Sequence, residues 1–95
     1  MHCTELTNFF NVADQDQRIH SMHILLYMAL FQKWNLNDLQ NPFFISRREM
    51  MKLSKIKSIC TYHKYIKELQ EFGYINYVPS YHPGVRTRVW MTTAS

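Results

Sequence analysis

The spacing of the apolar residues changes at Gly73, and this change limits the folds that the chain can adopt. Upstream of Gly73, apolar side chains recur every three or four residues, which predicts a helix that Ser58 caps and that runs to about residue 72. The inward face of this helix is expected to consist of Ile59, Tyr62, Ile66 and Leu69. Downstream the spacing becomes two, which is typical of strands.

Two strands are predicted in this downstream segment, at residues 74–80 and 85–92. Residues 81–84 (Tyr-His-Pro-Gly) have the composition of a turn between them. In the second strand Arg86 and Arg88 alternate with apolar residues and therefore share one face. Two strands around a short turn predict an antiparallel hairpin.

Before these elements, Ser46 and Glu49 have the spacing of a capping box, which predicts a short helix over residues 47–55. Met50 and Leu53 are expected to face inward from it. Residues 55–57 then form a tight connection to the helix that Ser58 caps. A very short strand is expected at residues 43–45, after the loop at 35–42.

The first part of the chain contains two more predicted helices. One covers residues 4–12, with Leu6, Phe9, Phe10 and Ala13 on one face, and a polar break follows at 14–18. The other is a long helix that Ser21 can cap. Its broad apolar face is expected to hold Ile24, Leu25, Tyr27, Met28, Phe31 and Trp34, with Leu26 and Leu30 on the other side.

This order of elements predicts a mainly α fold with a β-hairpin, namely a winged helix-turn-helix with an additional N-terminal helix. Residues 1–18 are expected to form the N-terminal helix and its connection, packed on a winged-helix domain at 19–95. In a helix-turn-helix the second helix, here about 58–72, enters the DNA major groove while the first crosses the backbone. The hairpin would be the wing.

The segment from residue 58 to 75 also resembles bacterial winged-helix regulators. The positions that match their pattern are Thr61, Tyr62, Lys64, Ile66, Leu69, Gly73 and Ile75. Over residues 26–91, about three quarters of the chain, the sequence is similar to short winged-helix proteins carried on bacterial mobile elements and described as transcriptional regulators. The resemblance implies DNA binding. Lys57 departs from the pattern because glycine is expected in the turn.

Charge is distributed unevenly along the chain. Residues 1–45 hold two bases against four acids, a net charge of −2, whereas residues 46–95 hold nine bases against three acids, a net charge of +6. Such segregation suggests a polyanionic partner for the second half. An ordinary solvated basic surface would have the same composition.

The helical wheel divides the candidate DNA contacts into two groups. Residues expected to reach base edges are Ser58, Thr61, His63 and Lys64. Residues expected to contact the phosphate backbone are Arg47, Arg48, Lys55, Lys57, Lys67, Arg86 and Arg88. Glu68 lies further along the predicted outward face, and Cys60 flanks it.

No metal site, cofactor site or catalytic motif is predicted. Cys60 and His63 are three residues apart, but the other candidate ligands of a structural zinc lie in unrelated elements. His20 and His23 have the same spacing without an acid nearby in the sequence, and they are interpreted as polar residues at a helix start. Glycine-rich phosphate loops and paired carboxylates are lacking as well, so no enzyme is expected.

Two classes of function remain open. The first is double-stranded DNA binding, as a transcriptional regulator or an accessory factor of a mobile element. The second is a winged-helix module for protein association without DNA binding. The basic residues of the third helix and the wing favour the first.

The expected compartment is the cytoplasm. Two cysteines far apart do not make a disulfide framework, no signal peptide is visible, and the apolar run at 24–31 is shorter than the ~20 residues of a membrane span. A homodimer through the first two helices is also considered, because the Leu6, Phe9 and Phe10 face and the Leu26 and Leu30 side are surplus apolar surfaces. These surfaces can equally cover each other within one chain.

Overall fold

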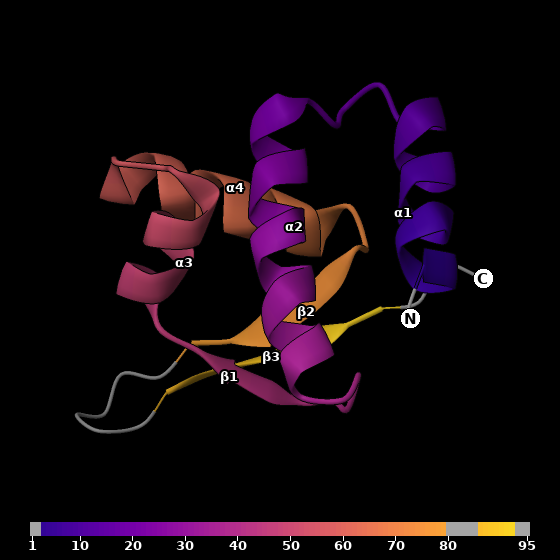
Figure 1. The fold of residues 1–95 in the computed structure, drawn as a ribbon. Coiled ribbons are helices and arrows are strands. Elements are labelled where there is room, and N and C mark those ends of the chain that lie inside the picture. The colour runs from indigo at the N-terminus through magenta and orange to yellow at the C-terminus, as the bar shows by residue number, and fades with distance from the viewer. Residues whose placement is uncertain (1–2, 80–85, 93–95) are drawn as a thin grey trace.

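The computed structural model describes residues 3–79 and 86–92. Within these ranges the chain forms four helices and a three-stranded antiparallel sheet (Figure 1). In chain order the elements are α1 (Cys3–Gln15), α2 (Ser21–Leu36), β1 (Phe43–Ile45), α3 (Arg47–Ser54), α4 (Ile59–Glu71), β2 (Ile75–Val78) and β3 (Thr87–Met91). The predicted order of helices and strands is confirmed. The described helices are all too short or too polar to cross a membrane.

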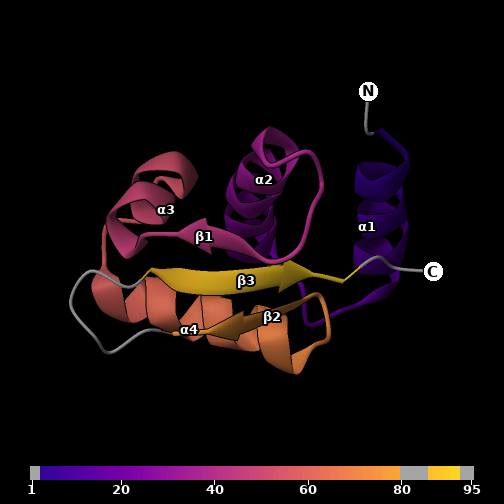
Figure 2. The same cartoon turned by 90° about the horizontal axis from the view of Figure 1, so that it is seen from below.

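The sheet has β3 in the middle, paired antiparallel with β1 on one side and with β2 on the other (Figure 2). Val89 and Met91 of β3 are buried, whereas Arg88 between them is exposed, so one face of the sheet covers the core. The antiparallel pairing of the two C-terminal strands agrees with the predicted hairpin. The predicted turn at 81–84 lies outside the described residues.

Helix α2 runs through the centre of the molecule, with α1 antiparallel beside it and the sheet below (Figure 1). Its buried side chains are His23, Leu26, Tyr27, Ala29, Leu30 and Trp34. Leu26 and Leu30 are fully buried, so of the two alternatives left open for them the one in which they are covered within one chain is confirmed. The predicted broad apolar face is divided, because Tyr27 and Trp34 are buried while Leu25 and Met28 are exposed.

Helix α1 is attached to α2 through an aromatic stack. The ring of Phe9 lies parallel to that of Tyr27, with centroids 3.6 Å apart, and Phe9 is buried with Ala13. Phe10 is exposed, so the predicted apolar face of this helix is only partly used within the chain. The helix ends at Gln15, three residues beyond the predicted end at residue 12.

Two of the three predicted helix caps are confirmed. The hydroxyl oxygens of Ser46 and Ser58 accept hydrogen bonds from the backbone N–H groups of Glu49 and Thr61, at the starts of α3 and α4. Ser21 was wrongly predicted as a cap, because His20 occupies that position and Ser21 is the first helical residue.

Candidate nucleic-acid interface

Helices α3 and α4 are joined by a short connection in which Lys55 makes the turn. Lys55 has φ 65°, the left-handed conformation in which a helix commonly ends, whereas Lys57 was the residue expected to adopt it. Ser54 is the last residue of α3, and its buried hydroxyl donates a hydrogen bond to the carbonyl of Met50 at 2.7 Å. Leu53 is exposed, contrary to its predicted inward position.

The buried side of α4 fixes which side chains the helix presents to solvent. Tyr62, Ile66 and Leu69 are buried as predicted, but Ile59 is 48% exposed. Burial of the Tyr62 ring raises the pKa of its hydroxyl to about 12, so this tyrosine stays neutral at physiological pH. The side of α4 that faces the core is thus defined by the residues from Tyr62 onwards, and Ile59 does not belong to it.

As a result the exposed face of α4 is rotated relative to the prediction. The exposed polar side chains of α4 are Cys60, His63, Lys64 and Lys67, followed in its last turn by Gln70 and Glu71. Thr61 is half-buried, and Glu68, expected on the outward face, turns towards α2 instead. His63 and Lys64 therefore keep their predicted exposure, and Lys67 moves from the flank to the centre of the face. Ser58 is exposed at the helix start.

A groove lies between α4 and the sheet and has a volume of about 490 Å³. Its lining is formed by Arg47, Tyr62, His63, Ile66, Lys67, Tyr77, Pro79 and Thr87. Arg47, from the start of α3, thus lies in the same groove as His63 and Lys67 of α4. Aromatic and apolar side chains form the walls. A groove of this kind fits a phosphate-bearing strand, because bases on its edge neutralise the charge and the walls pack against sugars.

The bases of α3 and the connection extend this surface. Arg48, Lys55 and Lys57 are exposed. Among the described residues, no carboxylate forms an ion pair with any of the nine bases beyond residue 45. Lysine and arginine charges without protein partners are available to a polyanion.

The two arginines of the predicted wing, Arg86 and Arg88, do not line the α4 groove. Arg86 lines a separate small groove with Lys33 and Phe44, at the end of α2 and beside β1. Arg88 lies on the sheet face turned away from the core, where its guanidinium is 6.0 Å from the centroid of the Trp90 ring. Phe44, which lines the groove with Arg86, is also the direct cross-strand partner of Arg88, so both arginines lie near Phe44 and away from the α4 groove.

A second cluster of titratable groups joins α2 to α4, and the sequence analysis missed it. His23 is 1% exposed, and its Nε2 lies 2.8 Å from Oε1 of Glu68. Its Nδ1 accepts a hydrogen bond from the backbone N–H of His20 at 3.2 Å. Glu68 is thus the acid that His20 and His23 lacked in the sequence, where it lies 45 positions away from His23.

The hydrogen bonds in this cluster assign the tautomer of His23. Nδ1 accepts and therefore carries no proton, so Nε2 carries it and donates to Glu68. Ligand atoms of His20, His23 and Glu68 lie within 4.8 Å of one another, the arrangement of a three-ligand metal site. A metal on Nε2 would move the ring proton to Nδ1, facing the N–H of His20, and the positive end of the α2 dipole also opposes a cation. These hydrogen bonds therefore favour a proton, and not a metal ion, between His23 of α2 and Glu68 of α4.

Comparisons of the chain with protein-family models, with curated proteins and with solved structures found no match.

Proposed function

We propose that this chain is a winged-helix protein that binds double-stranded DNA, with α4 in the major groove and the β2–β3 hairpin as the wing. The order α3, connection, α4 and hairpin supports this proposal, because it is the order of a winged helix-turn-helix. The observation that carries it is the set of unpaired bases on the exposed face of α4 and around the adjoining groove. A role in transcription or as an accessory factor of a mobile element fits this activity.

Each group of residues has its own expected part in binding. His63 and Lys64, near the start of α4, would reach base edges together with Ser58 and Thr61. Lys67 and Arg47 would hold the phosphate strand that lies in the groove between α4 and the sheet. Arg48, Lys55 and Lys57 would contact phosphates around the α3–α4 connection, while Arg86 and Arg88 would do so only where the duplex reaches the sheet.

Binding of a labelled duplex measured by fluorescence anisotropy at several salt concentrations tests the proposal. If about 4–6 phosphates are neutralised, the logarithm of the association constant should fall with that of salt concentration with a slope of about −4 to −5. The double variant R47Q/K67Q removes two expected phosphate contacts, so it should weaken binding to every sequence and make the slope less negative by about 2. Affinity that is absent, or independent of salt, would contradict DNA binding and favour the protein-association alternative.

The matched control is Lys33→Gln. It removes the same type of charge, but Lys33 lies in α2 and is paired with Glu49 at 3.0 Å. The slope should therefore stay near that of the parent protein. Thermal unfolding of all variants verifies that each remains folded.

A further inference from the structure

The solvent side of α2 is apolar and uncharged. Leu25, Met28 and Leu36 are 43%, 38% and 68% exposed, and they follow one another at the spacing of a single helix face. The polar residues of the same face, Ser21 and Gln32, are neutral. We refer to these five residues as the outer face of α2. A solvated helix face normally carries charged residues, so an uncharged one is unusual for a free surface.

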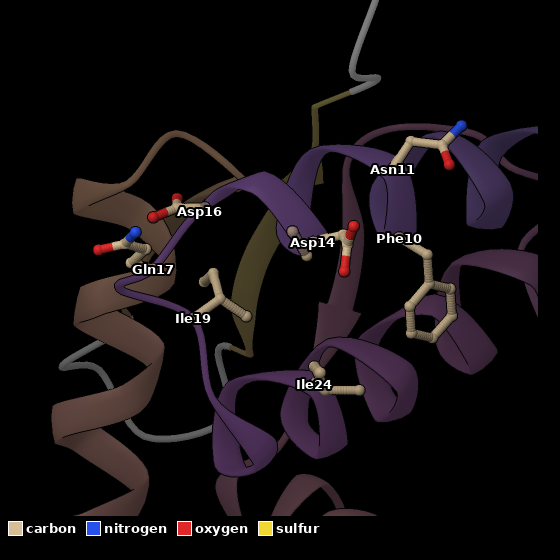
Figure 3. A pocket seen from close by; sticks show the side chains of 8 residues that line it. Phe10, Asn11, Asp14, Asp16, Gln17, Ile19 and Ile24 are labelled. Atoms are coloured by element: carbon tan, nitrogen blue, oxygen red, sulfur yellow. The ribbon is translucent and has the colours of Figure 1, made fainter.

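A groove adjoins this face between α1 and α2 and has a volume of about 590 Å³ (Figure 3). The apolar side chains around it include Phe10 of α1, Ile19 of the connection and Ile24 of α2 (Figure 3). Its polar lining residues are Asn11, Asp14, Asp16 and Gln17. Phe10 is 42% exposed at its edge. An apolar centre with a polar rim is the usual composition of a protein–protein interface.

The position of this surface relative to the charges also matters. α4 lies on one side of α2 (Figure 1) and packs against it. Because the buried side chains of α2 make these contacts, its exposed outer face points away from α4. Residues 1–45, which contain α1 and α2, have a net charge of −2, whereas the rest of the chain has +6. Two copies therefore repel each other least when they meet through α1 and α2.

We propose that a second copy of this chain binds here, forming a two-fold symmetric dimer in which the outer face of α2 lies against the α1–α2 groove of its partner. A two-fold interface requires a surface that is complementary to itself. Each copy has a ridge of Leu25 and Met28 beside a groove edged by Phe10 and Ile24. In a two-fold dimer the ridge of each copy can enter the groove of the other, so this surface meets the requirement. The proposal goes beyond DNA binding, since it concerns a surface that DNA does not need.

The dimer would present two α4 helices on surfaces that both stay free. Helix-turn-helix proteins commonly recognise paired half-sites in this way, with the spacing set by the dimer. The expected interface is of modest size. An ordinary stable interface takes about 800 Å² from each partner, so the exposed apolar residues need the polar rim of the groove to reach that area.

Sedimentation equilibrium at about 1–100 µM tests the proposal, because this range brackets micromolar dissociation constants. The expected mass approaches about 23 kDa at high concentration, twice the 11.5 kDa of one chain. The variant L25E/M28E should remain at the mass of one chain across the same range, because each ridge would bring two carboxylates into a partly apolar groove whose rim already holds Asp14 and Asp16. A parent protein that stays monomeric at every concentration overturns the proposal.

The control variant is Leu53→Glu, which adds a carboxylate at an equally exposed leucine of α3 and should leave the dimer intact. Association that survives L25E/M28E, or that L53E abolishes equally, would mean that another surface is used. DNA binding is measured separately on a short duplex. A monomeric L25E/M28E variant that still binds this duplex with a salt-dependent affinity would show that dimer and DNA contacts are independent, so either proposal can fail without the other.

Discussion

His23 is the residue whose surroundings give the chain its clearest sensitivity to pH. Burial lowers the pKa of its imidazole, and the hydrogen bond to Glu68 opposes this effect in part. The other charged groups that act on it are His20, which lowers the pKa further, and Asp16, which raises it. The rings of Tyr65 and Phe72 complete its environment, with centroids 4.8 and 5.6 Å from that of His23.

The lowered pKa of His23 has a consequence for stability. Below about pH 6.5, the ordinary pKa of histidine, the unfolded chain binds a proton that the folded chain resists, so the free energy of unfolding should fall as the pH falls towards the folded pKa. Urea unfolding at pH 5 to 8 should show this loss in the parent protein, and His23→Gln should flatten it. His63→Gln is the control, because His63 is exposed. An unchanged pH dependence in His23→Gln would refute the assignment.

Asp16 ties the α1–α2 connection to the end of α4 by a second set of contacts. Its carboxylate accepts hydrogen bonds from the Arg18 side chain at 2.8 and 2.9 Å and from the Tyr74 hydroxyl at 3.0 Å. The Arg18 hydrogen bonds hold the pKa of Asp16 well below its usual range, and burial together with the Asp16 contact raises the pKa of Tyr74 to about 12. Neither Asp16 nor Tyr74 stands out in the sequence. The two residues are far apart in the chain, and Asp16 lies in a segment that is predicted only as a polar break.

At the scale of elements, the α3–α4 connection depends on one strained residue. Lys55 is left-handed, which costs a residue with a Cβ about 1–2 kcal/mol relative to the right-handed conformation. Glycine avoids this cost, although it also makes the unfolded chain more flexible. The position is exposed, so little packing is lost when the side chain is removed.

Lys55→Gly should therefore raise the free energy of unfolding by about 0.5–1 kcal/mol, as measured by urea unfolding. Lys57→Gly makes the same change in charge two residues later, where φ is not positive. There glycine brings only extra flexibility, and stability should fall by about 0.5–1 kcal/mol. If the two variants shift stability in the same direction, the left-handed turn is not at Lys55.

At the scale of the whole molecule, α2 is the element on which the others pack. The core includes side chains of α1, α2, α3, α4 and all three strands. Leu26 and Leu30 are fully buried in it, while Leu25, next along the chain, is not. Adjacent leucines thus have different structural roles.

Leu26→Ala should lower the free energy of unfolding by about 2–5 kcal/mol, because it leaves a cavity among residues that cannot collapse completely. Leu25→Ala should change it by less than about 1 kcal/mol when measured at protein concentrations where the chain is monomeric. Chemical unfolding of the two variants gives a direct comparison. Comparable losses for both leucines would mean that the outer face of α2 is covered within one chain.

The sequence by itself determined the type, order and approximate bounds of the elements. Caps such as Ser46 and Ser58, the stop at Gly73 and the change from helical to strand spacing are local signals, and they act through the nearest few backbone groups. The same local reasoning placed His63 and Lys64 on the exposed side of α4. It placed Thr61 and Glu68 wrongly because it counted Ile59 as an inward residue.

Only the tertiary structure decided which side of α2 faces the core. This helix is apolar almost all round, so its sequence contains no contrast that would point one side inward, and the neighbours that pack on it made the choice. Partnerships across long sequence separations were hidden for the same reason. Glu68 reaches His23 across 45 positions, and the Asn41 amide bonds with the backbone of Met91 across 50, since such contacts depend on where whole elements pack.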